Sequence, residues 1–470
     1  MKKQLVILSA AAMVAAAAVP ALAFENEFHG MYKMVGYFGN FNDGTTFSAA
    51  NVNTVLRKDA DTGFFAEQRA RLQYIAKAND NLKLVTTFEL DTRFGGKREA
   101  YLGTLSGNDA GNIDADQLTL ETKSVYLDFN CPISGSNVKV GMQPWADSYQ
   151  SLFLLADMTG AQATKKFGAV TGNLGWFRFD DNTTAGAGDP GDLAADLFVV
   201  DGKFAINKDM KVGASYYFVN NQTGPTQAAT LSPGSATLPA GYPVLPTAST
   251  ATTYEKLHMF GLNADLTFGS ASIKPFAAYQ FGDQNDSDDI SAYLLGAVAK
   301  IKVANTGAVN LSGFYLSGDE NIAVGSDRDD FRVIGANQTY FNAANMWLLI
   351  RNGQAINSST SVLANDLTVG GRGLWGVFAG YEGTVDKLFY NANVGYAQTA
   401  EDRANQDGTI GTEINAQIGY KMFDNMSVSV AGAYAFLGDA LNSKDATKRI
   451  AGSADADDPY MMNVQVSYTF

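Results

Sequence analysis

The chain has 470 residues, a formal net charge of −14 and one cysteine, Cys131. A single cysteine excludes an intramolecular disulfide, and the presence of only two histidines argues against a histidine-based metal site. The strong net acidity argues against nucleic acid as a partner. Beyond the N-terminal segment, no stretch of about 18 apolar residues predicts a transmembrane helix.

Residues 1–23 have the pattern of a secretory signal peptide. Two lysines precede an apolar run over 5–18, and the small residues Ala21 and Ala23 form an A-x-A cleavage pattern. The alternative, a membrane-anchor helix, is disfavoured because the run is short for a bilayer span of about 20 residues. We therefore expect the mature protein to begin at Phe24 and residues 24–470 to form one domain.

The rest of the chain alternates apolar and polar residues in short segments joined by turns. In the predicted hairpin over 71–90, Leu84 and Phe88 share one face of a strand, whereas Lys83 and Glu89 share the other. Short turns are predicted near 79–80, 132–135, 172–173, 207–209, 269–270, 305–307, 383–385 and 423–425. Longer polar connections are predicted at 39–64, 93–117, 146–162, 181–192, 220–255, 283–289, 318–369, 400–408 and 438–459.

Nine long connections and eight short turns separate eighteen strands, an even number that brings both termini to the side of the short turns. Short turns on one side and long loops on the other are typical of a transmembrane antiparallel β-barrel. The sequence therefore predicts an all-β barrel of about 18 strands. The segment 318–369 is either a folded loop or two further strands, which leaves 16 or 20 strands open.

The last strand, 460–470, has an apolar face that ends in Tyr468 and Phe470, and a mostly polar opposite face. It resembles the C-terminal signal of bacterial outer-membrane proteins, which the barrel-insertion machinery reads. This resemblance implies that Tyr468 and Phe470 direct membrane insertion. A soluble sandwich could bury the same apolar face between sheets, but closure in lipid also satisfies every strand edge.

A barrel of this size has room for an aqueous channel. Charged side chains on its strands are expected to face the lumen, because Arg or Lys costs about 2–4 kcal/mol at mid-bilayer. The predicted lumen wall comprises Arg69, Arg71, Lys83, Glu89, Arg93 and Lys139. This wall is either a generic solvated surface with cross-strand ion pairs or one side of a constriction.

The third long connection, 146–162, is unusually apolar for an exposed loop and carries two acids, Asp147 and Asp157. We expect it to fold against the inner wall and to oppose its acids to the basic residues. The alternative is an outer loop that packs on a neighbouring subunit.

This architecture resembles the general porins of bacterial outer membranes, whose third loop folds into the lumen. The segment Val-Gly-Met-Gln-Pro at 140–144 is similar to the Val-Gly-Arg-Gln segment of several porin families, although Met142 stands where those families usually have arginine. The resemblance implies a passive diffusion channel for ions and small hydrophilic solutes in the outer membrane of a Gram-negative bacterium. It further implies a homotrimer in contact with lipopolysaccharide.

The sequence contains no nucleophile–base pair, phosphate loop or metal cluster, so we expect neither enzymatic activity nor a cofactor. A second function stays open. The barrel could be a sheath for a partner protein, such as an outer-membrane cytochrome, and this function would require an unobstructed bore.

Overall fold

A computed structural model describes the chain over residues 25–41, 56–95, 120–181, 194–223, 230–231, 243–244, 255–284, 288–320, 327–334, 341–356, 362–364, 366–403 and 405–470. The predicted signal peptide, 1–23, lies outside the described residues, and the first strand begins at Glu25. Among the described residues, no helix is long and apolar enough to cross a membrane.

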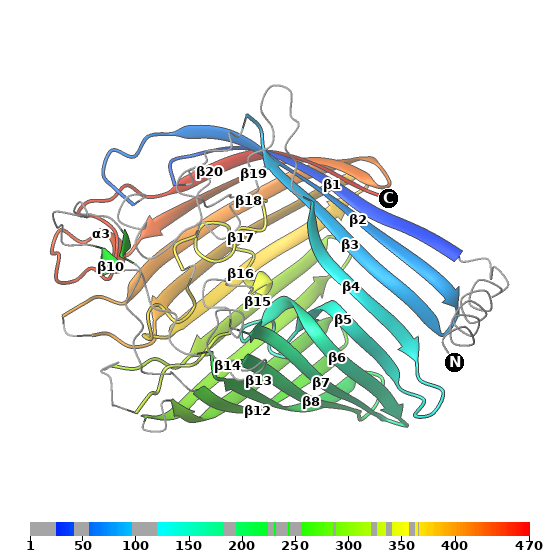
Figure 1. Cartoon of the computed structure of the whole chain (residues 1–470). Helices are drawn as coiled ribbons and strands as arrows, with labels where there is room; N and C mark the ends of the chain where they lie inside the picture. Colours follow the sequence, from blue (N-terminus) through cyan, green and yellow to red (C-terminus); the bar gives the residue numbers. More distant parts are fainter. Residues whose placement is uncertain are drawn as a thin grey trace.

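Eighteen strands form one antiparallel sheet that closes on itself (Figure 1). The strands are β1 (Glu25–Gly39), β2 (Gly63–Asn79), β3 (Leu82–Arg93), β4 (Glu121–Asn130), β5 (Asn137–Ala146), β6 (Leu155–Phe167), β7 (Val170–Asp181), β8 (Ala194–Ala205), β9 (Met210–Asn221), β12 (Glu255–Phe268), β13 (Ala271–Gln284), β14 (Asp288–Val303), β15 (Gly307–Leu316), β16 (Leu374–Val385), β17 (Leu388–Thr399), β18 (Thr409–Phe423), β19 (Met426–Leu437) and β20 (Tyr460–Thr469). A two-stranded ribbon, β10 (Thr230–Leu231) with β11 (Pro243–Val244), and two short helices, η2 (Asn342–Ala344) and α3 (Asp439–Asn442), lie in the connections. The prediction of eighteen strands is confirmed.

The barrel closes where β20 pairs with β1, in a register that matches Val466 with Met34. The backbone of Phe470 extends this seam, because its N–H and C=O groups exchange hydrogen bonds of 3.0 and 2.9 Å with Gly30. A side chain at Gly30 would collide with the Phe470 ring, since a Cβ there would lie 2.8 Å from its Cε1 atom. The chain terminus is therefore part of the closing contact.

Short turns gather at one end of the barrel and longer loops at the other, as predicted. Four boundaries were wrong: the turn expected at 172–173 lies at 168–169, where Gly168 has a φ of +60°, and the turn expected at 383–385 lies at 386–387. The connection expected at 283–289 is confined to 285–287, and the one expected at 146–162 is confined to 147–154, because the strands on both sides continue. The described part of 318–369 contains no barrel strand and forms a folded loop.

The two faces of each strand differ as a barrel in lipid requires. Large apolar side chains such as Phe260, Leu262, Val464 and Phe470 are exposed on the outer face. The inner face carries polar and charged side chains, together with apolar residues that two inward-folded loops bury. The first is the β5–β6 loop, 147–154, and the second is the β15–β16 loop, 317–373.

Candidate functional site

The β15–β16 loop is held in the lumen by a carboxylate of the barrel wall. Glu413, on the inner face of β18, is fully buried and accepts hydrogen bonds from three successive backbone amides, those of Trp347, Leu348 and Leu349. The three N–O distances are 2.7, 2.9 and 2.8 Å. Asn415 also donates to this carboxylate, at 2.8 Å. Because hydrogen bonds to a charged acceptor are worth about 1.5–3 kcal/mol each, Glu413 fixes the loop firmly.

Farther round the wall, β1 and β2 bind the next part of the same loop. The amide of Ile356 donates to Oε2 of Glu67 at 3.0 Å, and Lys33 Nζ donates to the Gly353 carbonyl at 3.1 Å. Asn352 Nδ2 donates to the hydroxyl of Tyr37 at 2.8 Å. Figure 1 shows this loop as the yellow coil inside the barrel.

The β15–β16 loop also brings apolar side chains into the lumen. Trp347 and Phe341 are 1% exposed, and Phe341 packs edge-on against Phe314 of β15 at a ring distance of 4.9 Å. Burial of such side chains stabilises the docked loop by roughly 1.5–3 kcal/mol each. The loop is therefore packed inside the lumen and does not project from the surface of the barrel.

The β5–β6 loop is organised by a carboxylate of its own. Asp147 accepts hydrogen bonds of 2.6–3.0 Å from the backbone amides of Tyr149, Ser151, Phe153 and Leu154. These bonds hold a backbone in which Gln150 and Ser151 both have positive φ, at 62° and 65°, a conformation that L-residues adopt at a cost of roughly 1–3 kcal/mol each. Burial raises the pKa of Asp147 to about 6, and the four amides oppose this rise.

The same loop packs on the wall formed by β9 and β12. The Tyr149 hydroxyl bonds to Ser215, and its ring lies over Gly261, where a Cβ atom would be 2.5 Å from Tyr149 Cζ. Phe153 stacks on Tyr217 of β9 at a ring distance of 5.8 Å. The loop thus folds inward, as the apolar sequence predicted, although it is shorter than expected.

The two loops touch each other inside the barrel. The amide of Ile334 donates to the Phe153 carbonyl at 3.1 Å, and the rings of Phe153 and Phe331 meet edge-on at 6.5 Å. Together, the hydrogen bonds and ring contacts of the two loops follow the wall from β8 and β9 through β18 to β1 and β2. The next arc of the wall, on β2, β3 and β4, carries the predicted charged side chains.

On this arc, Arg69 and Arg71 of β2 form a ladder of ion pairs with β3. Arg69 Nε donates to Asp91 at 2.6 Å and Arg71 Nε donates to Glu89 at 2.7 Å. The side chains of Arg69 and Arg71 are 24% and 35% exposed, whereas that of Glu89 is only 3% exposed. The guanidinium groups therefore cover the acids and face the solvent of the lumen.

Sequence reasoning did not identify the partner of Glu89 on β4. This partner is Lys123, whose Nζ lies 3.7 Å from Glu89 and 3.0 Å from Asp157. A shift in register between Thr87 and Phe88 moves this end of β4, and a single sequence gives no signal of such an irregularity.

The other predicted wall residues lie apart from this ladder. Lys83 pairs with Asp128 at 3.3 Å near the short turns, and Lys139 lies 5.6 Å from the ring centre of Tyr126. Arg93 stacks over Phe65 at 4.2 Å. Tyr468 and Phe470 lie on the outer face of β20, with their rings stacked at 5.7 Å.

The placement of Asp157 in an inward loop was wrong. Asp157 lies within β6, opposite Pro144 of β5, on the strand face opposite to that of buried Met158. Since successive strand residues point to opposite faces, its side chain begins on the outer side of the wall. Asp147 lies in the loop as predicted, but its carboxylate binds the amides of its own loop and does not point to a basic wall.

The main anchors of the β15–β16 loop, Glu413 and Glu67, were not predicted as site residues. Each lies at a strand position whose side chain points into the lumen, and this alternation was the only available signal. Their partners are backbone amides about 65 and 289 residues away in sequence. A pattern of side chains does not indicate which backbone amides they bind. The described residues hold no group of three or more His, Cys, Asp or Glu side chains that could bind a metal ion.

Closed antiparallel architecture, short turns at one end and inward loops define a barrel of the bacterial outer-membrane porin type. Three solved structures share this fold. OccAB4 of Acinetobacter baumannii is 13% identical with a TM-score of 0.52, covering 95% of this chain and 98% of its own. The outer membrane protein opdK of Pseudomonas aeruginosa is 10% identical with a TM-score of 0.51 and the same coverage. OccAB1 of Acinetobacter baumannii is 12% identical with a TM-score of 0.51, covering 94% and 96%.

At these identities the likeness establishes the fold. No protein-family model matches the sequence, and no curated protein matches it.

Proposed function

We propose that the chain is an outer-membrane channel for passive diffusion of ions and small hydrophilic solutes. The observation that carries this proposal is the combination of a closed 18-stranded barrel with two docked loops that narrow its bore. Barrels of this size hold a water-filled lumen unless something fills it. Loops held by buried carboxylates set the width of such a lumen while they are docked.

The pore runs beside the ladder of Arg69 and Arg71. The contacts of the two loops extend around the wall from β8 to β2, whereas the guanidinium groups of this ladder keep a quarter to a third of their surface exposed. Hydrated charge on one side of a constriction and packed loops on the other would expose passing solutes to a transverse field. This arrangement supports a constriction between the loops and the β2–β4 wall.

The sheath for a partner protein is disfavoured. A threaded cytochrome would need the bore that Trp347, Phe341 and the rest of the β15–β16 loop occupy, and these side chains are buried against the wall. We see no nucleophile–base pair among the described residues of the loops and the wall, and we propose that the protein has no enzymatic activity and no cofactor.

The short turns are assigned to the periplasm and the long loops to the cell exterior, as in other outer-membrane barrels. The outer apolar face fits the hydrocarbon core of the membrane. A homotrimer, contacts with lipopolysaccharide, and recognition of Tyr468 and Phe470 by the insertion machinery remain parts of this proposal.

The test is the current through purified protein in a planar bilayer. A channel gives stable unit steps in potassium chloride, and liposomes that contain the protein swell in small sugars but not in large ones. An intact, heat-modifiable barrel that carries no current and admits no sugar would overturn the proposal.

A further inference from the structure

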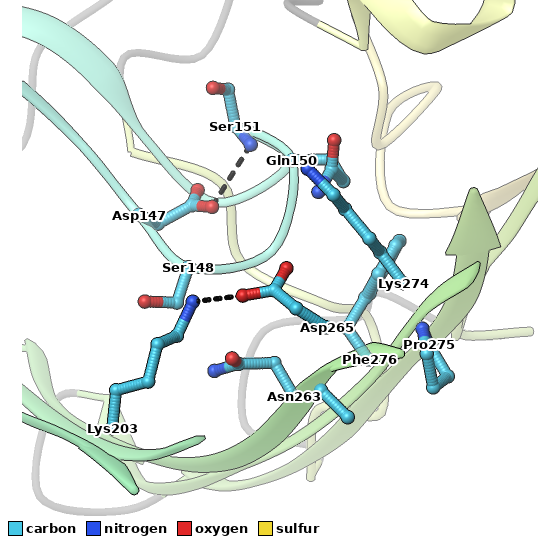
Figure 2. A pocket seen from close by; sticks show the side chains of 11 residues that line it. Asp147, Ser148, Gln150, Ser151, Lys203, Asn263, Asp265, Lys274, Pro275 and Phe276 are labelled. Atoms are coloured by element: carbon cyan, nitrogen blue, oxygen red, sulfur yellow. Dashed lines mark hydrogen bonds and ion pairs between the residues drawn. The ribbon is translucent and has the colours of Figure 1, made fainter. Parts of the chain in front are cut away.

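A polar cavity of about 380 Å³ lies between the β5–β6 loop and the wall formed by β8, β12 and β13 (Figure 2). The register of the strands explains its position. Tyr149 of the loop packs over Gly261 of β12, and the cavity begins at the next inward-facing residue of this strand, Asn263. Asn263 lies opposite Gly213 of β9, where a Cβ atom would be 2.6 Å from Asn263 Oδ1. The volume falls within the range of about 300–1,000 Å³ that is typical of ligand pockets.

The charges at this cavity cancel. Two lysines and two aspartates line it, and one further charge of each sign lies beside it: Lys203, Lys274, Asp147 and Asp265 in the lining, then Lys211, the cross-strand neighbour of Asp265, and Asp201, which accepts from Ser148 at 3.5 Å. Lys203 Nζ pairs with Asp265 Oδ2 at 2.6 Å, and Asp147 binds four amides of its own loop. A ligand with a net charge of either sign would therefore meet like charges as well as opposite ones.

Neutral polar groups at the cavity have unused hydrogen-bonding capacity. The side chains of Gln150, Ser151 and Asn263 are half-buried, and they make no hydrogen bond within the part of the chain that the structure describes. Figure 2 shows Gln150 on the loop side and Asn263 beside the Lys203–Asp265 pair on the wall side. Because amides and hydroxyls both donate and accept, the cavity presents donors and acceptors on two opposite sides.

We infer that this cavity binds an uncharged solute with several hydroxyl groups, namely a monosaccharide. Each sugar hydroxyl supplies one donor and two acceptor lone pairs, so neighbouring hydroxyls match the amides of Gln150 and Asn263 without bringing a charge to the lysines and aspartates. Hydrogen bonds from Lys274 and to Asp265 are charge-assisted and add to the binding. The inference rests on the proposed function, because the sugar reaches the cavity through the lumen.

The test compares glucose with glucosamine and glucuronate, which have the same ring but carry one positive and one negative charge. In planar bilayers, glucose should interrupt the potassium chloride current with a frequency that saturates as its concentration rises. Each charged analogue should require a concentration at least several-fold higher for half-saturation. A polyethylene glycol of similar size, which has no adjacent hydroxyl groups, should show no saturation.

The double variant Gln150→Met with Asn263→Leu removes both amides without changing any charge. It should raise the half-saturating concentration of glucose several-fold, and each single substitution should raise it less. Gln417→Met is the matched control, because Gln417 is an inner-face amide of β18 that donates to Ser429 at 3.0 Å and does not line the cavity. This control should leave the glucose effect unchanged.

An equal loss in the control, a non-saturating glucose effect, or a charged analogue that acts as strongly as glucose would overturn the site. Binding of labelled glucose to detergent-solubilised protein separates this outcome from failure of the channel itself. A barrel that conducts potassium chloride but does not respond to glucose refutes only the site, whereas one that binds glucose without conducting refutes only the channel.

Discussion

The two inward loops reach the same lumen by different means. The β5–β6 loop carries its own anchor, Asp147, within a few residues of the amides it binds. The β15–β16 loop instead depends on Glu413 and Glu67, which the barrel wall supplies from strands distant in sequence. A short loop can therefore be ordered by local sequence, whereas a long loop in a barrel is ordered by the strands that it crosses.

The largest effect is expected from Glu413→Gln. A glutamine has one acceptor oxygen, and its NH₂ group would face amides that also donate, so most of the bonding to Trp347, Leu348 and Leu349 is lost. Unsatisfied buried groups cost about 1–3 kcal/mol each, enough to release the loop without unfolding the barrel. Single-channel current should become larger and noisier.

Glu382→Gln is the control for this variant. Glu382 is also an inward glutamate, but it pairs with Lys300 and both side chains are about half exposed, at 43% and 50%. Equal currents in the two variants would show that Glu413 does not hold the β15–β16 loop in the working channel.

A methyl group added at a glycine of the wall should displace one loop and leave the other in place. Gly261→Ala would place a carbon 2.5 Å from Tyr149 Cζ and displace the β5–β6 loop. Gly395→Ala would place one 2.5 Å from Phe378 Cδ1 of β16 and 2.6 Å from Met346 Sδ, and should displace the β15–β16 loop. Overpacking of this kind costs about 1–3 kcal/mol, and proteolysis should detect each displacement in one loop only.

Gly432→Ala serves as the control for both, since its Cβ would approach nothing closer than 3.6 Å. If both loops resist proteolysis in all three variants, the loops do not pack on Gly261 and Gly395.

A pH effect is expected for the β5–β6 loop. The pKa of Asp147 is about 6 in the docked loop, above its ordinary value of 3.8, so the docked state binds a proton more readily than a released one. Docking is therefore strongest at low pH and weakens as pH rises through 6, by at most about 3 kcal/mol. Current fluctuations caused by this loop should be rarer at pH 5 than at pH 7.5.

Asp147→Asn should remove this pH dependence while loosening the loop at every pH, because its amide group cannot accept all four hydrogen bonds. A pH dependence that persists in this variant would assign the effect to another group.

The smallest effect is expected for ion selectivity. Replacing Arg69 and Arg71 with Gln leaves Glu89 and Asp91 without their guanidinium partners, so the reversal potential should move towards cation preference. Charges at the narrowest point dominate because fields are screened over about 8 Å at physiological salt. Arg178→Gln, which removes the same charge from the outer face of β7, should leave the potential unchanged.

An unchanged reversal potential in the double variant of Arg69 and Arg71 would show that the constriction lies away from the β2–β3 wall.

Strand alternation and turn residues were enough to predict the barrel, its closing strand and the charged face of β2 and β3. Apolar residues such as Leu152 and Phe153 indicated an inward β5–β6 loop, although Leu155 and Asp157 belong to β6. The β15–β16 loop stayed ambiguous because Trp347–Ile350 is as apolar as a strand. Its docking depends on wall carboxylates and main-chain amides, which a pattern of side chains does not reveal.

The decisive comparison is the conductance of two loop-shortened barrels beside the intact protein. One variant replaces 341–356 with a short Gly-Ser linker, and the other replaces 148–153 in the same way. Because the β15–β16 loop spans more of the wall, its removal should raise single-channel conductance several-fold and admit larger sugars, whereas removal of the shorter loop should have a smaller effect. Unchanged conductance in the first variant, with a heat-modifiable barrel intact, would show that this loop does not set the width of the pore.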